Sequence, residues 1–201
     1  MAKYTKIPEE TFKQIQLNAG VLLSDFDPSA ATVENSKILG ATTGGTSFTA
    51  TPSFTDFGED IDNCPKNTKE LKRLSSWEVK MTGTFVTITA ATAKMLMSAA
   101  NDSGNKITPR NDLEDSDFAD LWWVGDYSDQ TGATNGGYVA IHMHNGLSTG
   151  GFSLQSTDKA KGNFAFEFTG HYSISEQDTV PFEVYVKAGT EETQSEQNGG
   201  A

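Results

Sequence analysis

Apolar and polar residues alternate with a period of two over several short stretches, most clearly over residues 77–85. One set of alternate positions there is apolar and the other is polar or charged: Trp77, Val79, Met81 and Phe85 against Glu78, Lys80, Thr82 and Thr84. Successive side chains of a strand point to opposite faces of a sheet. This stretch therefore predicts a strand with one face on a core and the other at a polar surface.

The same alternation returns late in the chain, at residues 164–168 and 182–186. Both stretches place phenylalanine or valine at every second position and predict two core strands. Residues 139–143 alternate in the same way, and weaker alternation predicts strands at residues 12–17, 21–24, 48–57, 121–127 and 152–156. Steps rich in glycine and asparagine, among them Asn145 and Gly146, predict the turns between strands.

One segment departs from this pattern. Thr89 can cap a helix that continues through residues 90–100, where nearly every residue is a favourable or neutral helix former, and residues 101–104 provide its end. The chain is therefore predicted to be mainly β: a β-sandwich or barrel-forming sheet with one flanking α-helix at about residues 89–100.

Two further segments lack strand alternation. Residues 58–74 carry mixed charge and predict a long loop between two strands, with a short helix over residues 69–74. Residues 190–201 contain no apolar side chain beyond the final alanine and predict a flexible tail. We therefore expect a single domain over residues 1–189, followed by that tail.

Composition narrows the classes of function. Lys and Arg number 15 and Asp and Glu 27 among 201 residues, so the formal net charge is −12, the wrong sign for a protein whose function is to bind phosphates. No apolar stretch approaches the roughly 18 residues of a membrane helix, and the N-terminal residues lack a signal-peptide core. The single cysteine, Cys64, excludes an internal disulfide framework. We expect a soluble chain that uses no cofactor and no membrane.

Candidate catalytic and metal-binding residues are few. His142 and His144 lie two apart on one strand face, a spacing that can chelate a metal, but two ligands are too few and the sequence places no third. His171 has no nucleophile motif beside it. The acidic run from Asp112 to Asp129 lacks the spacing of a calcium loop and predicts a solvated or interface-facing patch. We therefore expect no enzyme.

Trp122 and Trp123 are a possible sugar-stacking platform. Adjacent strand residues point to opposite faces, so only one of the two indoles can line a binding surface and the other should be in the core.

Charge is distributed unevenly along the chain, which favours assembly over catalysis. The end of the 58–74 segment is basic and the region after residue 111 is acidic; the residues concerned are Lys66, Lys69, Lys72 and Arg73 against Asp112, Glu114, Asp115 and Asp117. Complementary patches on one chain favour head-to-tail contacts between copies, which produce rings and stacks. We expect these residues to form the contacts between stacked rings.

The order of these elements resembles that of the major tail tube proteins of long, non-contractile-tailed bacteriophages. The resemblance spans most of residues 8–188: an early strand pair, a long excursion, the strand at residues 76–85 leading into the helix, and a closing strand pair at residues 164–173 and 180–186. It implies a structural virion protein whose copies close into rings, expected to be hexameric, that stack into a tube conducting the DNA genome during ejection.

The resemblance also implies a setting and partners. The protein would assemble with itself in the host cytoplasm, reside in the virion tail, and meet tape-measure, tail terminator and tail-tip proteins, while DNA passes through the lumen without specific binding. Carboxylates facing the lumen would repel phosphates, and Glu78, Glu167 and Glu183 are the candidates. Two alternatives stay open: a carbohydrate-binding β-sandwich of a receptor-binding protein, and the tube protein of a contractile injection or secretion system.

Overall fold

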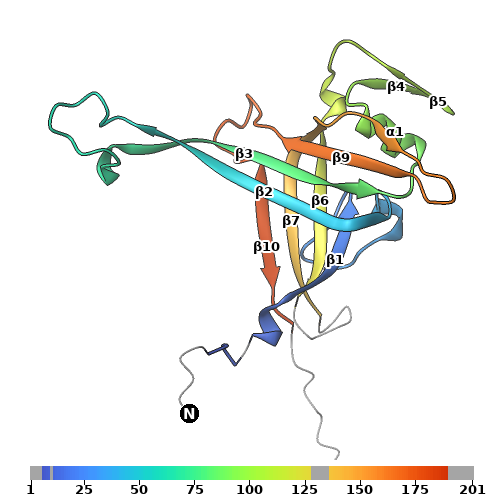
Figure 1. The fold of residues 1–201 in the computed structure, drawn as a ribbon, viewed down its shortest axis with the longest axis horizontal. Coiled ribbons are helices and arrows are strands. Elements are labelled where there is room, and N and C mark those ends of the chain that lie inside the picture. The colour runs from blue at the N-terminus through green and yellow to red at the C-terminus, as the bar shows by residue number, and fades with distance from the viewer. Residues whose placement is uncertain (1–5, 10, 128–135, 190–201) are drawn as a thin grey trace, which may run out of the picture.

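The computed structural model describes residues 6–9, 11–127 and 136–189, which form two layers of antiparallel strands. The first layer has the order β1-β6-β7-β10, and its strands are β1 (Gln16–Leu23), β6 (Ala119–Tyr127), β7 (Gly137–Ser148) and β10 (Phe182–Lys187). The second has the order β2-β3-β9-β8, and its strands are β2 (Thr42–Asp56), β3 (Lys72–Phe85), β9 (Asn163–Gly170) and β8 (Ser153–Gln155). The strands of the two layers cross (Figure 1). The predicted mainly-β sandwich with one flanking helix is confirmed.

Strand β7 belongs to both layers. Its first part pairs with β6 and β10, whereas Leu147 and Ser148 pair with Thr169 and Phe168 of β9. The strand turns the corner at Asn145, whose φ of 48° lies in the left-handed region that asparagine tolerates better than most residues. The predicted turn at Asn145 and Gly146 is therefore wrong: these residues bend one strand and do not join two.

The main core lies between the layers and follows the predicted alternation. Val79, Met81 and Phe85 of β3 are fully buried, while their neighbours Glu78 and Lys80 face outward. The other buried members come from both layers and from the helix: Leu22, Leu96, Leu121, Met143, Phe166 and Phe168. Burial of these side chains is the main source of the fold's stability.

A second, smaller core lies on the outer face of the first layer. The segment that follows β1, which includes η2 (Asn35–Lys37), places Phe26 over Trp122 and Tyr138, with ring centroids 5.6 and 5.4 Å apart. The Tyr138 hydroxyl donates a hydrogen bond of 2.7 Å to the Pro28 carbonyl. This segment therefore covers part of a sheet face that would otherwise expose apolar side chains.

The helix α1 (Ala90–Leu96) begins where expected and ends earlier. The Thr89 hydroxyl accepts a hydrogen bond of 3.1 Å from the Thr92 N–H, so the predicted N-cap is confirmed. Residues 97–100 are not helical, because Ser98 has a φ of 64° and the Ser148 hydroxyl donates a hydrogen bond of 3.0 Å to the Leu96 carbonyl. The chain then forms a small hairpin of β4 (Ala100–Ser103) and β5 (Lys106–Pro109), which replaces the predicted last helical turn.

Strands β2 and β3 form a long hairpin that projects from the body of the molecule (Figure 1). The predicted loop at residues 58–74 is its tip, and it is shorter than expected because Lys72, Arg73 and Leu74 already pair with β2. The predicted short helix is only the single turn η3 (Lys69–Leu71). Residues 12–14 form another such turn, η1 (Phe12–Gln14), where a strand was expected. No helix among the described residues has the length and apolar composition needed to cross a membrane.

Candidate functional site

The tip of the β2–β3 hairpin exposes several large apolar side chains. We call residues 54–74 the arm. Its large apolar side chains are about half exposed: Phe54 54%, Phe57 56%, Ile61 51% and Leu74 46%. An isolated two-stranded hairpin is marginally stable in water, so such an extension is typical of a segment that contacts another molecule.

The arm is ordered from within by Asp56. Its two carboxylate oxygens accept hydrogen bonds of 2.9 Å from the backbone N–H groups of Gly58 and Asn67. These backbone hydrogen bonds, Gly58 first, lower the pKa of Asp56 below its ordinary value, because they stabilise the charged form. The carboxylate thus fastens the two sides of the tip together.

The structure places the predicted basic contact residues on the arm, where Lys66, Lys69, Lys72 and Arg73 are exposed. Lys72 donates a hydrogen bond of 3.2 Å to Asn67 Oδ1 and lies over the Phe54 ring, 4.9 Å from its centroid. Lys72 therefore lies against an apolar side chain of the arm, and Lys69 pairs with Glu70 at 3.7 Å. The arm also carries carboxylates, so it is mixed in charge and not a basic patch: Asp56, Glu59, Asp60, Asp62 and Glu70.

The acidic partners expected for them are only partly available. Asp112 and Asp115 are exposed, but both carboxylate oxygens of Asp117 accept hydrogen bonds of 2.6 Å from Arg110, and the Asp117 side chain has no exposed area. Glu114 also pairs with Arg110, although 62% of its side chain is exposed. Asp117, near the end of η4 (Asp115–Asp117), is thus a buried intramolecular partner, which corrects its assignment as a stacking contact.

The three candidate lumen carboxylates do not share one face. Glu78 and Glu167 lie on the outer face of the second layer, where Lys80 pairs with Glu78 at 2.8 Å and this hydrogen bond raises the pKa of Lys80. Glu183 lies on β10, opposite His142, on the outer face of the first layer. Only Glu78 and Glu167 can line one surface, and the grouping with Glu183 is corrected.

The tryptophans do not form an open sugar platform. Trp122 is 6% exposed and lies under Phe26. Trp123 packs against the main core and donates its indole N–H to the Ala19 carbonyl at 3.0 Å. A Cβ at Gly20 would lie 2.6 Å from that indole, so the glycine backbone covers the ring closely.

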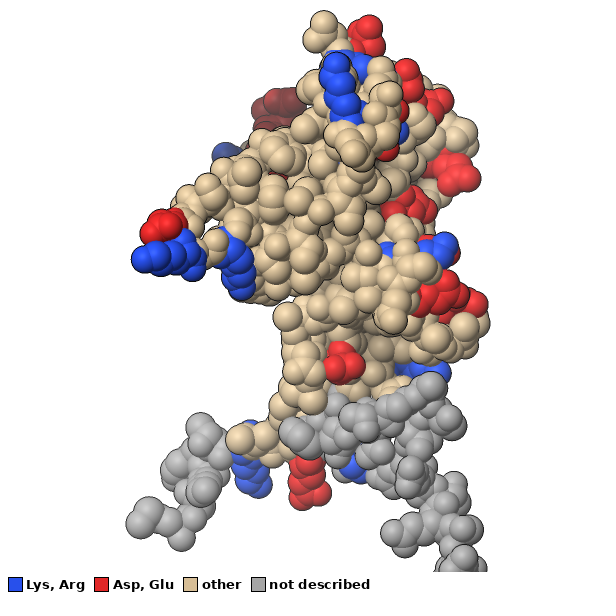
Figure 2. Space-filling model, turned by 90° about the vertical axis from the view of Figure 1, so that its right-hand side faces the viewer, with Lys and Arg blue, Asp and Glu red and all other residues tan. Residues whose placement is uncertain are grey.

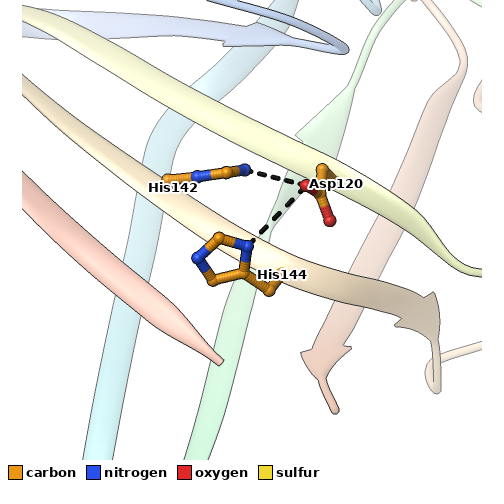
Figure 3. Close-up of side chains that lie close together, drawn as sticks. All are labelled: Asp120, His142 and His144. Carbon is orange, nitrogen blue, oxygen red and sulfur yellow. Dashed lines mark hydrogen bonds and ion pairs between the residues drawn. The ribbon is translucent and has the colours of Figure 1, made fainter. Parts of the chain in front are cut away.

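Three side chains that sequence reasoning did not group meet on the outer face of the first layer. Asp120 of β6 and His142 and His144 of β7 point toward one another (Figure 3). The Nε2–H of His142 donates to Asp120 Oδ2 at 3.1 Å, and His144 Nδ1 lies 3.7 Å from the same oxygen. Burial, followed by the neighbouring His144, lowers the pKa of His142, while Asp120 acts in the opposite direction.

In the view of Figure 2, acidic side chains are most numerous along the right-hand edge and others lie at the left-hand tip and in the lower part, and no continuous basic patch is seen. A scan of protein-family models and a search of curated proteins both gave no match to this chain. Function is therefore inferred from geometry and from the pattern of the sequence.

Proposed function

We propose that this chain is a structural subunit that assembles with itself into stacked rings, forming a tube of the kind that conducts DNA in a long, non-contractile phage tail. The observation that carries the proposal is the arm, an ordered hairpin tip with half-exposed apolar side chains among charged groups of both signs. The proposal assigns no catalytic step to any residue.

The arm needs a partner surface. Phe54, Phe57 and Leu74 lie beyond the region where β3 pairs with β9, so within the described ranges this part of β3 has no strand neighbour other than β2. Burial of these side chains against the next ring would stabilise both the arm and the stack. Exposed ion pairs contribute only about 0–1 kcal/mol each, so the apolar contact must supply most of the free energy of stacking.

Sheet edges support lateral contacts within a ring. Among the described residues β10 pairs with β7 alone and β2 pairs with β3 alone. Val184 and Val186 of β10 are 52% and 61% exposed, although they lie on the same face of the strand as Phe182, which packs on the main core. Unprotected edge strands tend to pair with other chains, and closure into a ring would supply each edge with a neighbour.

The outer face of the second layer suits the wall of a DNA channel. Its positions along β2, β3 and β9 are mostly serine and threonine, with Glu78, Lys80 and Glu167 as the charged groups. Two carboxylates against one lysine leave a weakly negative surface, which repels phosphates and offers them few contacts.

The test is electron microscopy of the purified full chain over a range of concentrations, with analytical ultracentrifugation of the same samples. The matched variant replaces residues 54–75 with Asn-Gly, which favours a two-residue hairpin turn between Ser53 and Ser76 and leaves the core residues of β3 in place. We expect rings or tubes from the natural chain and a monomer with an unchanged fold from the variant. A natural chain that stays monomeric at every concentration, or a variant that assembles equally well, contradicts the proposal.

The structure bears differently on the two alternative functions, a carbohydrate-binding module and the tube protein of a contractile system. The covered indoles of Trp122 and Trp123 weaken the carbohydrate-binding reading. A tube protein of a contractile system would use the same arm and edges, and partner identity separates it from a phage tail. For a phage tail, the expected partners are the tape-measure, terminator and tail-tip proteins.

A further inference from the structure

We propose that Asp120, His142 and His144 form a binding site for a single divalent transition-metal ion, with Zn²⁺ as the best fit. The proposal does not depend on tube assembly, because all three residues belong to one chain and lie away from the arm. Each residue offers one ligand atom, and these atoms lie within 4.8 Å of one another.

The donor set matches the metal. Imidazole nitrogen and carboxylate oxygen are ordinary Zn²⁺ ligands, and bonds of about 2.0–2.1 Å in a tetrahedral site place ligand atoms about 3.3 Å apart. Asp120 Oδ2 lies 3.1 Å from His142 Nε2 and 3.7 Å from His144 Nδ1. These two separations bracket the tetrahedral value, while the two histidine nitrogens lie within 4.8 Å of each other. Rotation of the rings must therefore bring the histidine nitrogens closer together to place all three ligands on one ion.

The backbone holds the ligands in place. Trp122 pairs with His142, and Asp120 lies two residues before Trp122 on β6, so the alternation of the strand places Asp120 on the same face as the histidines. Asp120 Oδ1 accepts a hydrogen bond of 3.0 Å from the Asn145 N–H at the corner of β7, which leaves Oδ2 directed at the histidines. The His142 ring stacks on Trp122, with centroids 3.9 Å apart and planes 9° apart.

The outer shell of the site is also suited to a metal. His144 Nε2 is buried and has no hydrogen-bond partner among the described residues, and Glu183 Oε1 lies 4.0 Å from it. A ligating histidine commonly donates its other ring N–H to a carboxylate, which fixes the tautomer. With His144 Nδ1 on the metal, Glu183 takes this role after a small side-chain movement.

An entry path and a free coordination position are present. The Asp120 side chain is 49% exposed, whereas those of His142 and His144 are 13% and 21% exposed. A polar pocket lined by Asp120, His144, Asn145, His171, Ser173, Glu176 and Thr179 opens beside the cluster. Three protein ligands therefore leave the fourth position for water or a small polar ligand.

The experiment uses the full chain without an affinity tag and with Cys64→Ser, so that no tag or thiol competes for metal. Zn²⁺ affinity is measured by titration calorimetry after chelator treatment, and the coordination geometry is read from the visible absorption of bound Co²⁺. The ligand residues are identified by NMR of the imidazole rings, of which the chain has only three. We expect one ion per chain, a tetrahedral Co²⁺ spectrum, and perturbed signals of His142 and His144 with a smaller change at His171.

The variants are His144→Gln and Asp120→Asn, with Asp158→Asn as the matched control, because Asp158 is exposed between β8 and β9 and does not line the pocket. Loss of a ligand should weaken binding by more than the roughly 10- to 100-fold typical of outer-shell changes, whereas Asp158→Asn should leave it within a few fold. The imidazole NMR of the natural ligand set tests the site even if a variant misfolds. Absent binding, or binding that survives His144→Gln or is lost equally in Asp158→Asn, overturns the proposal.

Discussion

Replacement of Phe57 by serine on the arm should weaken assembly while leaving the subunit folded. Phe57 is 56% exposed, and its backbone N–H donates to the Leu71 carbonyl at 3.0 Å, a bond that the substitution does not touch. The side chain therefore contributes little to folding of the isolated chain and has about half of its surface free for a partner.

The size of the effect follows from that free surface. Complete burial of a phenylalanine side chain stabilises by about 1.5–3 kcal/mol, so burial of the exposed half contributes about 1–1.5 kcal/mol per arm contact. Each 1.4 kcal/mol is tenfold in an equilibrium constant, so the critical concentration for assembly should rise about five- to tenfold. Stability of the subunit should change by no more than about 0.5 kcal/mol, as for most surface substitutions.

Light scattering over a concentration series measures the critical concentration, and urea denaturation measures subunit stability. Ile174→Ser is the matched control, because Ile174 is 90% exposed on the turn after β9 and outside the arm. Equal shifts in the two variants, or an unchanged critical concentration in Phe57→Ser, would refute the assignment of the arm as the assembly contact.

Three other predictions test separate features of the molecule. Glu167→Lys should slow DNA passage through assembled tubes without blocking their formation, since a lysine adds a phosphate contact. Normal ejection kinetics would contradict the assignment of Glu167 to the channel wall. Phe26→Ala should lower the free energy of unfolding in urea by about 3–5 kcal/mol, because Phe26 is only 5% exposed, whereas the exposed Phe152→Ala should cost less than about 1 kcal/mol. The lowered pKa of Asp56 means that its stabilisation of the arm is fully present above the unfolded value of 3.8 and is lost as pH falls through the lower folded pKa. The protection factors of the Gly58 and Asn67 N–H groups, which are corrected for intrinsic exchange, should therefore fall on acidification in the natural chain and be low at every pH in Asp56→Asn.

Strands buried on one face were predictable because their pattern is local. Val79, Met81 and Phe85 alternate with polar residues, and Phe164, Phe166 and Phe168 do the same, so period-two alternation alone gives the core face of β3 and β9. The N-cap at Thr89 was equally local. The end of that helix was not predictable from local sequence, because the hydroxyl of Ser148, 52 residues beyond Leu96, donates a hydrogen bond to the Leu96 carbonyl and the chain turns at Ser98.

The arm was misjudged because its strands lack a buried face. Residues 72–76 are all exposed, so no buried face requires apolar residues at alternate positions there. The mixed charge of the tip therefore led to the prediction of a loop. The acidic run was misjudged for a related reason: Arg110 stands just before it in sequence, and only the fold brings its guanidinium onto Asp117.

The histidine cluster shows most clearly where the local pattern stops being informative. The spacing of His142 and His144 was visible, but the third ligand depends on which strand pairs with β7 and in which register. The pairing of Trp122 with His142 brings Asp120, two residues before Trp122, onto their face, and the left-handed Asn145 turns the corner of β7 so that its N–H meets Asp120 Oδ1. Asn145 and Gly146 carry the composition of a turn, and sequence reasoning ended the strand where the structure bends it. Because β7 continues through this bend, it pairs with β6 and β10 before the corner and with β9 after it. The same corner therefore joins the two layers and positions the Asn145 N–H that donates to Asp120.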